Sequence, residues 1–194
     1  ASDDPYATIQ HGVDQVAYGG TVHVLSGTYN EQVIINSKPV TVVAESGRAS
    51  TAVVSDGTNR VFTVANCPDT VRIIGFDISG GNAENDTLSA FGGGILSIAS
   101  PIIVDSCLIH NNQAPTGGGG GVCFRDGAYG IIRNCEIYTN TAGGLSGGGI
   151  MASMADGGVI ENNLIYGNIS GNAGGGIMIY HSEVNPATAY TITG

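Results

Sequence analysis

The sequence predicts an all-β solenoid, in which short strands repeat along the chain and stack into a parallel β-helix. Four glycine runs each precede an aliphatic residue, and these aliphatic residues are spaced 27, 28 and 27 positions apart. Isoleucine and asparagine series recur beside them every 28 residues. Fixed periods of this length indicate units that stack to bury a shared core. The three series are Ile95, Val122, Ile150 and Ile177; Ile109, Ile137 and Ile165; and Asn112, Asn140 and Asn168.

A helix is expected before the repeats, over residues 6–18, within an N-terminal cap segment 1–20. Its apolar residues lie at helical spacing on one stripe. Asp3 and Asp4 are candidates for its N-terminal cap, where carboxylates complement the helix dipole. The glycine pair that follows is expected to end it. The stripe comprises Ile9, Val13, Val16 and Ala17.

Residues 21–194 are expected to form the β-helix, with about six coils of 27–28 residues. Val104 and Ile109 should both face the core, yet they are five positions apart, so strict alternation would place them on opposite faces. One residue between them must therefore break the pleat. The best candidates stand at equivalent positions of successive repeats, and Asn and Gly tolerate the left-handed conformation that such a corner needs. They are Ser106, Asn134 and Asn162, with Gly75 in an earlier copy, and they turn Cys107, Cys135 and Asn163 inward.

Composition excludes several classes of function. Sixteen acidic residues against six basic ones give a formal net charge of −10, which disfavours nucleic acid and anionic membranes as partners. No apolar run approaches the length of a membrane-spanning helix. The four cysteines contain no C-x-x-C pair, so we expect no zinc site and no cofactor. Stacked Cys107 and Cys135 are expected to be buried thiols or a disulfide.

The N-terminal segments resemble the cap and first coil of secreted right-handed parallel β-helix proteins with the pectin-lyase-like fold. The Asn-Cys-x-Ile and Gly-Gly-Gly-Ile repeats are similar to those of polymorphic outer-membrane adhesins. The resemblance implies a right-handed β-helix in an extracellular or cell-surface protein. That fold hosts lyases, hydrolases, adhesins and structural modules, so it does not assign an activity. The segments that carry the resemblance are residues 6–14, 20–24, 27–29 and 31–35.

Two outward columns of side chains contain polar or aromatic residues. Equivalent residues on successive coils lie about 4.8 Å apart, so members of a column touch. Asp105, Arg133 and Glu161 alternate in charge, and form either an acid–base cluster or an exposed ion-pair ladder. The second column contains His110, Tyr138 and Tyr166, which either bind sugar rings of a polysaccharide or cover one another.

A third outward column is apolar. Leu96 and its equivalents follow the inward aliphatic residues, so they should point outward, under a covering loop or as a partner surface. The asparagine series is expected to form an inward ladder, with amides bonded from coil to coil. The apolar column comprises Leu96, Cys123, Met151 and Met178.

No catalytic constellation is recognisable, and the Asn-Thr-Asp, Asp-Asp, Gly-His-Gly and Arg-Ile-Lys signature of the hydrolases of this fold is absent. The sequence therefore favours a noncatalytic structural, adhesive or filament-forming module. A polysaccharide-active enzyme and a carbohydrate-binding module remain alternatives. The last residues, Tyr190–Gly194, repeat the start of a rung and stop at a corner, as in a truncated or open solenoid. Either the chain continues, or a partner such as a second copy covers that edge.

Overall fold

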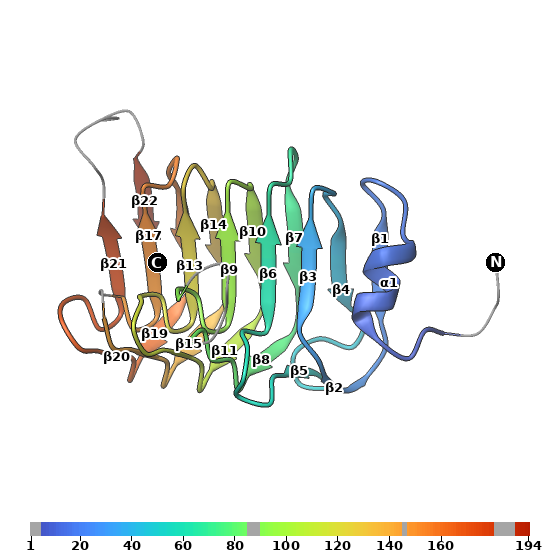
Figure 1. The fold of residues 1–194 in the computed structure, drawn as a ribbon, viewed down its shortest axis with the longest axis horizontal. Coiled ribbons are helices and arrows are strands. Elements are labelled where there is room, and N and C mark those ends of the chain that lie inside the picture. The colour runs from blue at the N-terminus through green and yellow to red at the C-terminus, as the bar shows by residue number, and fades with distance from the viewer. Residues whose placement is uncertain (1–4, 85–89, 145–146, 181–188) are drawn as a thin grey trace.

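The computed structural model describes residues 5–84, 90–144, 147–180 and 189–194. They form a parallel β-helix of short strands with one short helix at the N-terminal end (Figure 1). Every strand pair is parallel, and each strand bonds to its equivalents on the neighbouring coils. The all-β solenoid predicted from the sequence is confirmed.

Three long sheets enclose the core, and a short fourth one lies at a corner (Figure 1). Sheet A contains β1 (Thr21–Val24), β4 (Thr41–Ala44), β7 (Val71–Ile74), β10 (Ile102–Asp105), β14 (Gly130–Arg133), β18 (Gly158–Glu161) and β22 (Tyr190–Thr193). Sheet B contains β2 (Gly27–Asn30), β5 (Thr51–Val54), β8 (Asp77–Ser79), β11 (Leu108–His110), β15 (Glu136–Tyr138) and β19 (Leu164–Tyr166).

Sheet C lies opposite sheet A across the core (Figure 1). It contains β3 (Val33–Asn36), β6 (Phe62–Ala65), β9 (Ile95–Ile98), β13 (Val122–Arg125), β17 (Ile150–Ser153) and β21 (Ile177–Tyr180). Sheet D contains the two-residue strands β12 (Gln113–Ala114), β16 (Thr141–Ala142) and β20 (Ile169–Ser170).

The predicted corner residues turn the chain from sheet A to sheet B. Ser106, Asn134 and Asn162 have φ values of 56°, 55° and 53°, and Gly75 has 78°. This left-handed residue lets both flanking strands send side chains into the core. Val104 and Ile109 are accordingly both fully buried. Two further corner series in the left-handed region were not predicted: Gly80, Asn111, Thr139 and Gly167; and Ser37, Asn66, Ala99, Asp126 and Met154.

The N-terminal helix is shorter than predicted. α1 spans Ile9–Gln15 rather than residues 6–18. Thr8 is its N-cap, and its hydroxyl accepts a hydrogen bond from the His11 N–H. The proposed capping residues Asp3 and Asp4 lie outside the described residues. Val16 already has an extended conformation, and the chain leads from there into β1.

The apolar column beside the glycine runs is buried rather than open to a partner. Leu96 and Cys123 are fully buried and Met151 is 2% exposed, and Phe91 packs against them as part of a second small core. Met178, at the C-terminal end of the column, is partly exposed. The glycine runs fold back over the column. A Cβ atom on Gly119, whose φ is 66°, would lie 2.8 Å from the Cβ atom of Cys123, so glycine is needed there. The interpretation as a partner surface is therefore wrong for the buried members, and the covering loop holds.

Candidate functional site

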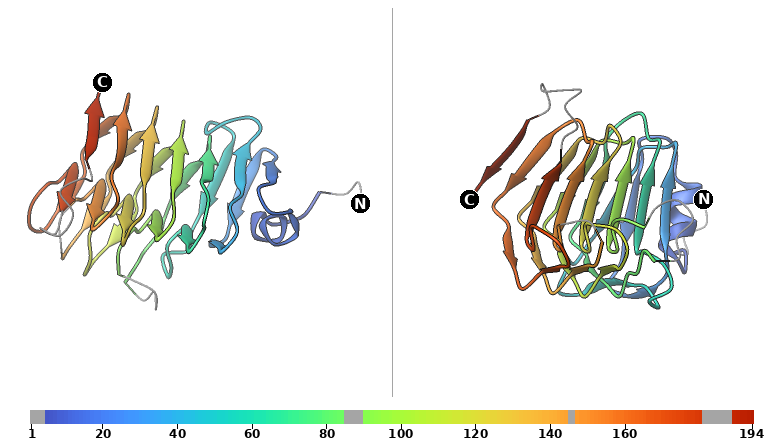
Figure 2. Two further views of the ribbon diagram at one scale, coloured as in Figure 1. Left: turned by 90° about the horizontal axis from the view of Figure 1, so that it is seen from above. Right: turned by 60° about the vertical axis from the view of Figure 1, so that its left-hand side comes forward.

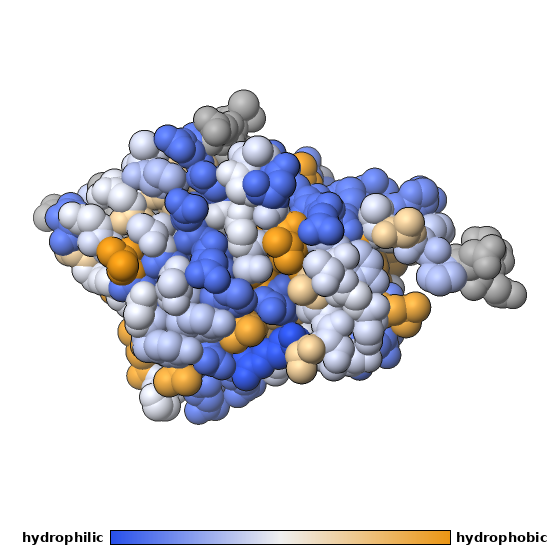
Figure 3. Space-filling view, turned by 90° about the horizontal axis from the view of Figure 1, so that it is seen from below, coloured by the Kyte–Doolittle hydropathy of each residue, from blue (hydrophilic) through white to orange (hydrophobic). Residues whose placement is uncertain are grey.

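The aromatic column lies on the outer face of sheet B, which Figure 3 shows as mainly hydrophilic with separate hydrophobic patches. The rings of His110 and Tyr138 are stacked with centroids 5.0 Å apart at an interplanar angle of 11°. Tyr138 and Tyr166 are stacked at 5.1 Å and 5°. Each ring therefore packs face to face against its neighbour, and Tyr138 has a ring on both faces, which favours mutual packing over sugar stacking for this column.

Carboxylates hold the polar atoms of this column in place. His110 Nε2 lies 2.9 Å from Asp77 Oδ1, and its Nδ1 lies 2.8 Å from the Asn111 amide nitrogen. The Tyr166 hydroxyl donates to Glu136 Oε1 at 2.8 Å, a bond that raises the pKa of Tyr166. Both ring nitrogens of His110 are therefore hydrogen-bonded within the chain.

The alternating charge column lies on the outer face of sheet A. Arg133 Nε donates to Asp105 Oδ2 at 2.8 Å, while Asn134 and Ser106 donate to Oδ1 at 3.0 and 2.9 Å. Partial burial acts to raise the pKa of Asp105, but these hydrogen bonds and the charge of Arg133 outweigh it and hold the pKa below its usual value. Glu161 follows Arg133 in register on β18. A carboxylate saturated in this way is a stabilised anion, which suits a structural ladder better than a proton-transfer group.

The asparagine series forms a continuous ladder inside the coils. Asn112 Nδ2 donates to Asn140 Oδ1 at 3.0 Å, and Asn140 Nδ2 donates to Asn168 Oδ1 at 3.0 Å. Each oxygen also accepts a backbone N–H from the preceding coil, and each amide nitrogen donates to a backbone carbonyl there, as with Asn140 and Ile109 at 2.9 Å. These amides satisfy buried backbone groups at the corner, so their role is structural.

Cysteines take the same role at the other corner. The Cys107 N–H donates to Cys135 Sγ at 3.4 Å, just as the Cys135 N–H donates to Asn163 Oδ1 at 2.9 Å. Both thiols are free and buried, so the disulfide alternative is not present. The neighbouring Cys107 thiol, together with burial, raises the pKa of Cys135 and keeps that thiol protonated. Among the described residues, no cluster of three or more His, Cys, Asp or Glu side chains is arranged to hold a metal ion.

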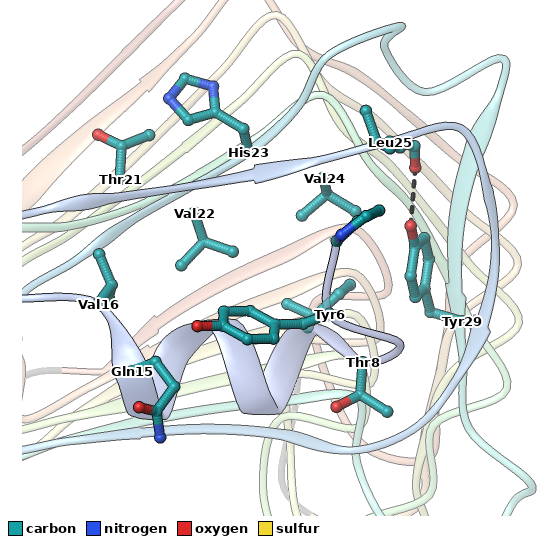
Figure 4. Close-up of a pocket in the computed structure, with 13 residues that line it drawn as sticks. Tyr6, Thr8, Gln15, Val16, Thr21, Val22, His23, Val24, Leu25 and Tyr29 are labelled. Carbon is teal, nitrogen blue, oxygen red and sulfur yellow. Dashed lines mark hydrogen bonds between the residues drawn. The ribbon is translucent and has the colours of Figure 1, made fainter. Parts of the chain in front are cut away.

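A cavity of about 360 Å³ lies between α1 and the first coil (Figure 4). Val22 and Val24 point from β1 toward the helix, while His23 points to the other side, where it pairs with Glu45. Tyr29 closes one end, and its hydroxyl donates to the Leu25 carbonyl at 3.0 Å. The lining is mainly aliphatic, aromatic, amide and hydroxyl, so the cavity presents no acid–base pair for catalysis.

The N-terminal end of the β-helix is closed by α1, which lies across the first coil (Figures 1 and 2). Glu31 accepts hydrogen bonds from the first N–H groups of the helix, Ile9 at 2.8 Å and Gln10 at 2.9 Å. Lys38 Nζ donates to carbonyls of the last turn, Val13 at 2.7 Å and Val16 at 2.8 Å. These charges complement the helix dipole at both ends.

The side chain of Gln10 also blocks the outer edge of sheet C. Its Oε1 accepts the Ile34 N–H at 2.6 Å, and its Nε2 donates to the Ile34 carbonyl at 3.1 Å, so the amide replaces a neighbouring strand. The roles of Gln10, Glu31 and Lys38 were not predicted from the sequence. The available signal was that Lys38 is one of only six basic residues and that Glu31 is isolated among apolar strands.

The last coil has no further coil beside it among the described residues. Strands β19, β20, β21 and β22 stand last in their sheets, so their outer edges have no strand partner among the described residues. Inward side chains on this coil have no described coil packed over them. Ile160 is 2% exposed, whereas its neighbour in register on the last coil, Ile192, is 53% exposed. Leu164 and Ile169, at outward positions of the same coil, are 58% and 62% exposed. Within residues 158–180 and 189–194 the single charged side chain is Glu161. The described part of this coil is therefore poor in charged side chains.

None of the helices in the described part of the chain is both long and apolar enough to span a membrane. The chain is similar in structure to a pectin methylesterase from Aspergillus niger in deglycosylated form, with 14% identity, a TM-score of 0.49, and 95% of this chain and 66% of that one covered. It is also similar to a mutant pectin methylesterase in complex with hexasaccharide IV, with 13% identity, a TM-score of 0.46, and coverage of 95% and 65%. The chain thus spans just under two thirds of the length of these enzymes.

No curated protein matches the chain at a significant level. A family model described as a right-handed beta helix region matches residues 50–193, well over half of the chain. The repeats, corners and ladders described above lie within or next to this segment. The chain therefore belongs to the right-handed beta helix region family.

Proposed function

We propose that this chain is a noncatalytic structural module, working outside the cell or at its surface, that assembles with other copies of itself through its C-terminal coil. The observation that carries the proposal is the contrast in one core column, where Ile160 is 2% exposed and Ile192 is 53% exposed. A second copy would cover the aliphatic side chains and supply partners for the strand edges. Few charged side chains lie on the described part of this coil, which limits local repulsion between two copies.

The closed N-terminal end determines the geometry of such a contact. Because Gln10 occupies the edge of β3 and α1 covers the first coil, that end offers no row of unpaired strand groups at β3. We propose a contact between two C-terminal coils, which is isologous.

Sedimentation equilibrium over a range of protein concentrations tests the proposal. The average mass is expected to rise with concentration, and Ile192→Lys, which places a charge in the contact, is expected to lower it. Leu25→Lys is the matched control, because Leu25 is 55% exposed at the opposite end. An average mass that stays at 19.6 kDa up to high concentration, or an equal effect of both substitutions, would overturn the proposal.

A further inference from the structure

The edge of β1 that faces away from β4 has no strand partner among the described residues, because β1 is the first strand of sheet A. The Val24 carbonyl accepts a hydrogen bond from the Glu45 N–H, so the backbone groups of Val24 face β4. Alternate residues of a strand direct their backbone groups to opposite edges. Thr21 and His23 therefore present their N–H and C=O groups on the edge away from β4.

The cavity between α1 and the first coil follows this edge. Its lining includes every residue of the range 21–25. Because successive side chains of a strand point to opposite faces, a cavity that touches all of them lies along the edge of the strand rather than on one face. Thr21 and His23 are exposed, so the edge is accessible from solvent. Val22 and Val24 point from the strand toward α1 and form an apolar wall (Figure 4).

The edge of β3 shows what kind of group completes a strand edge at this end. There the Gln10 side chain accepts the Ile34 N–H at 2.6 Å and donates to the Ile34 carbonyl at 3.1 Å. An amide that offers one donor and one acceptor thus takes the place of a neighbouring strand. Along β1 the corresponding space is the cavity of about 360 Å³, a volume within the range of ligand-binding pockets. The group that would complete this edge is likewise an amide.

We propose that this cavity binds an extended segment of another polypeptide, which adds to sheet A as a strand beside β1. The backbone of the segment bonds to Thr21 and His23, and its alternate side chains lie against α1 beside Val22 and Val24. The lining contains no Asp, Glu, Lys or Arg side chain. The segment that fits is therefore uncharged, with an aliphatic residue at every second position.

This inference goes beyond the proposed function and does not rest on it. The cavity lies at the N-terminal end of the β-helix, whereas self-association is proposed for the C-terminal coil (Figure 1). Strand addition at β1 joins the chain to a different protein, and the C-terminal contact joins two copies. Either one can fail without the other.

A short synthetic peptide tests the site. The probe is acetyl-Thr-Val-Thr-Val-Thr-amide, whose alternation is the same in both directions, so it fits a parallel or an antiparallel strand. In an NMR titration the amide signals of residues 20–25 are expected to shift and saturate, with a dissociation constant of about 1 mM or lower. The peptide with lysine in place of both valines is the control and should not bind. No saturable shift at residues 20–25, or shifts at the last coil alone, would overturn the inference.

Two further comparisons test whether the backbone carries the binding. Only every second N–H of an added strand faces β1, so N-methylation of either the threonines or the valines of the probe is expected to weaken binding about tenfold or more, and the other pattern is expected to have little effect. His23→Pro removes the N–H directed at the cavity, which an edge strand tolerates, and is expected to weaken binding by a similar factor. His23→Ala keeps this N–H and is the matched control.

Circular dichroism checks that both variants of His23 are folded. Equal binding of the two methylated peptides, or equal affinity of His23→Pro and His23→Ala for the probe, would overturn the inference.

Discussion

The first and last coils of this β-helix differ in what covers their outer strand edges. At the N-terminal end, Gln10 pairs with the backbone of Ile34, and Glu31 and Lys38 fix the helix that covers the coil. At the C-terminal end, residues equivalent to buried core positions are exposed. In a solenoid each coil obtains its burial from its neighbours, so one sequence pattern gives a core residue or a surface residue according to what lies beside it.

The largest expected effect separates a middle coil from the last one. Ile160→Ala should lower the free energy of unfolding by about 2–5 kcal/mol, because it leaves a cavity in a packed core. Ile192→Ala at the next position of the same column should cost less than about 1 kcal/mol, since that side chain is already half exposed. Urea denaturation at low protein concentration measures both. Equal costs would contradict the contrast between the coils.

The asparagine ladder provides a second comparison between a middle coil and the last coil. Asn140→Ala removes the acceptor of the buried Asn112 N–H and the donor to Ile109, so we expect a loss of about 2–3 kcal/mol. Asn168→Ala removes equivalent bonds nearer the open end, where water can replace them, and we expect about 1 kcal/mol. Denaturant unfolding of the two variants gives the comparison. A larger cost at Asn168 would show that the ladder is anchored from the C-terminal end.

Weakening the contacts that hold α1 over the first coil should have a moderate effect on stability. Lys38→Met removes the charge and the donors that hold the last turn of α1, and we expect a loss of about 1 kcal/mol. Lys38→Arg, which keeps charge and donors, is the control and should lose less. Thermal unfolding followed by circular dichroism is the measurement. If both variants unfold like the parent chain, the helix is held by its apolar stripe alone.

The smallest expected effect is the pH dependence of the charge ladder. The pKa of Asp105 is lowered in the folded state, so its contribution to stability is present above the ordinary carboxyl pKa of about 4 and is lost as the pH falls through the folded value. Asp105→Asn should therefore flatten the fall in stability below about pH 4, by under about 1 kcal/mol because Arg133 is partly exposed. Urea midpoints from about pH 2.5 to pH 6 test this. An unchanged slope would mean that other carboxylates set it.

Several features that recur with the repeat were predictable from the sequence, because the period aligns residues that touch. The corners at Ser106 and Asn134 and the inward direction of Cys107 followed from the odd spacing of the aliphatic residues. Leu96 and Met151 were placed on the correct outward parity, but what covers them was left open, because the period of the glycine runs does not show on which side of the strand those runs lie. The cap contacts of Gln10 and Glu31 have no periodic signal, and they were not predicted. They occur once and join segments more than 20 residues apart.

Hydrogen exchange at low and high protein concentration is the most direct test of the contrast between the ends. The outward N–H groups of β19 and β21 on the last coil are expected to exchange quickly in dilute solution and to gain protection as the concentration rises. Those of α1 and β3 should show the same protection at both concentrations, because Gln10 and Glu31 already bond there. Protection on the last coil that does not change with concentration would contradict self-association through that coil.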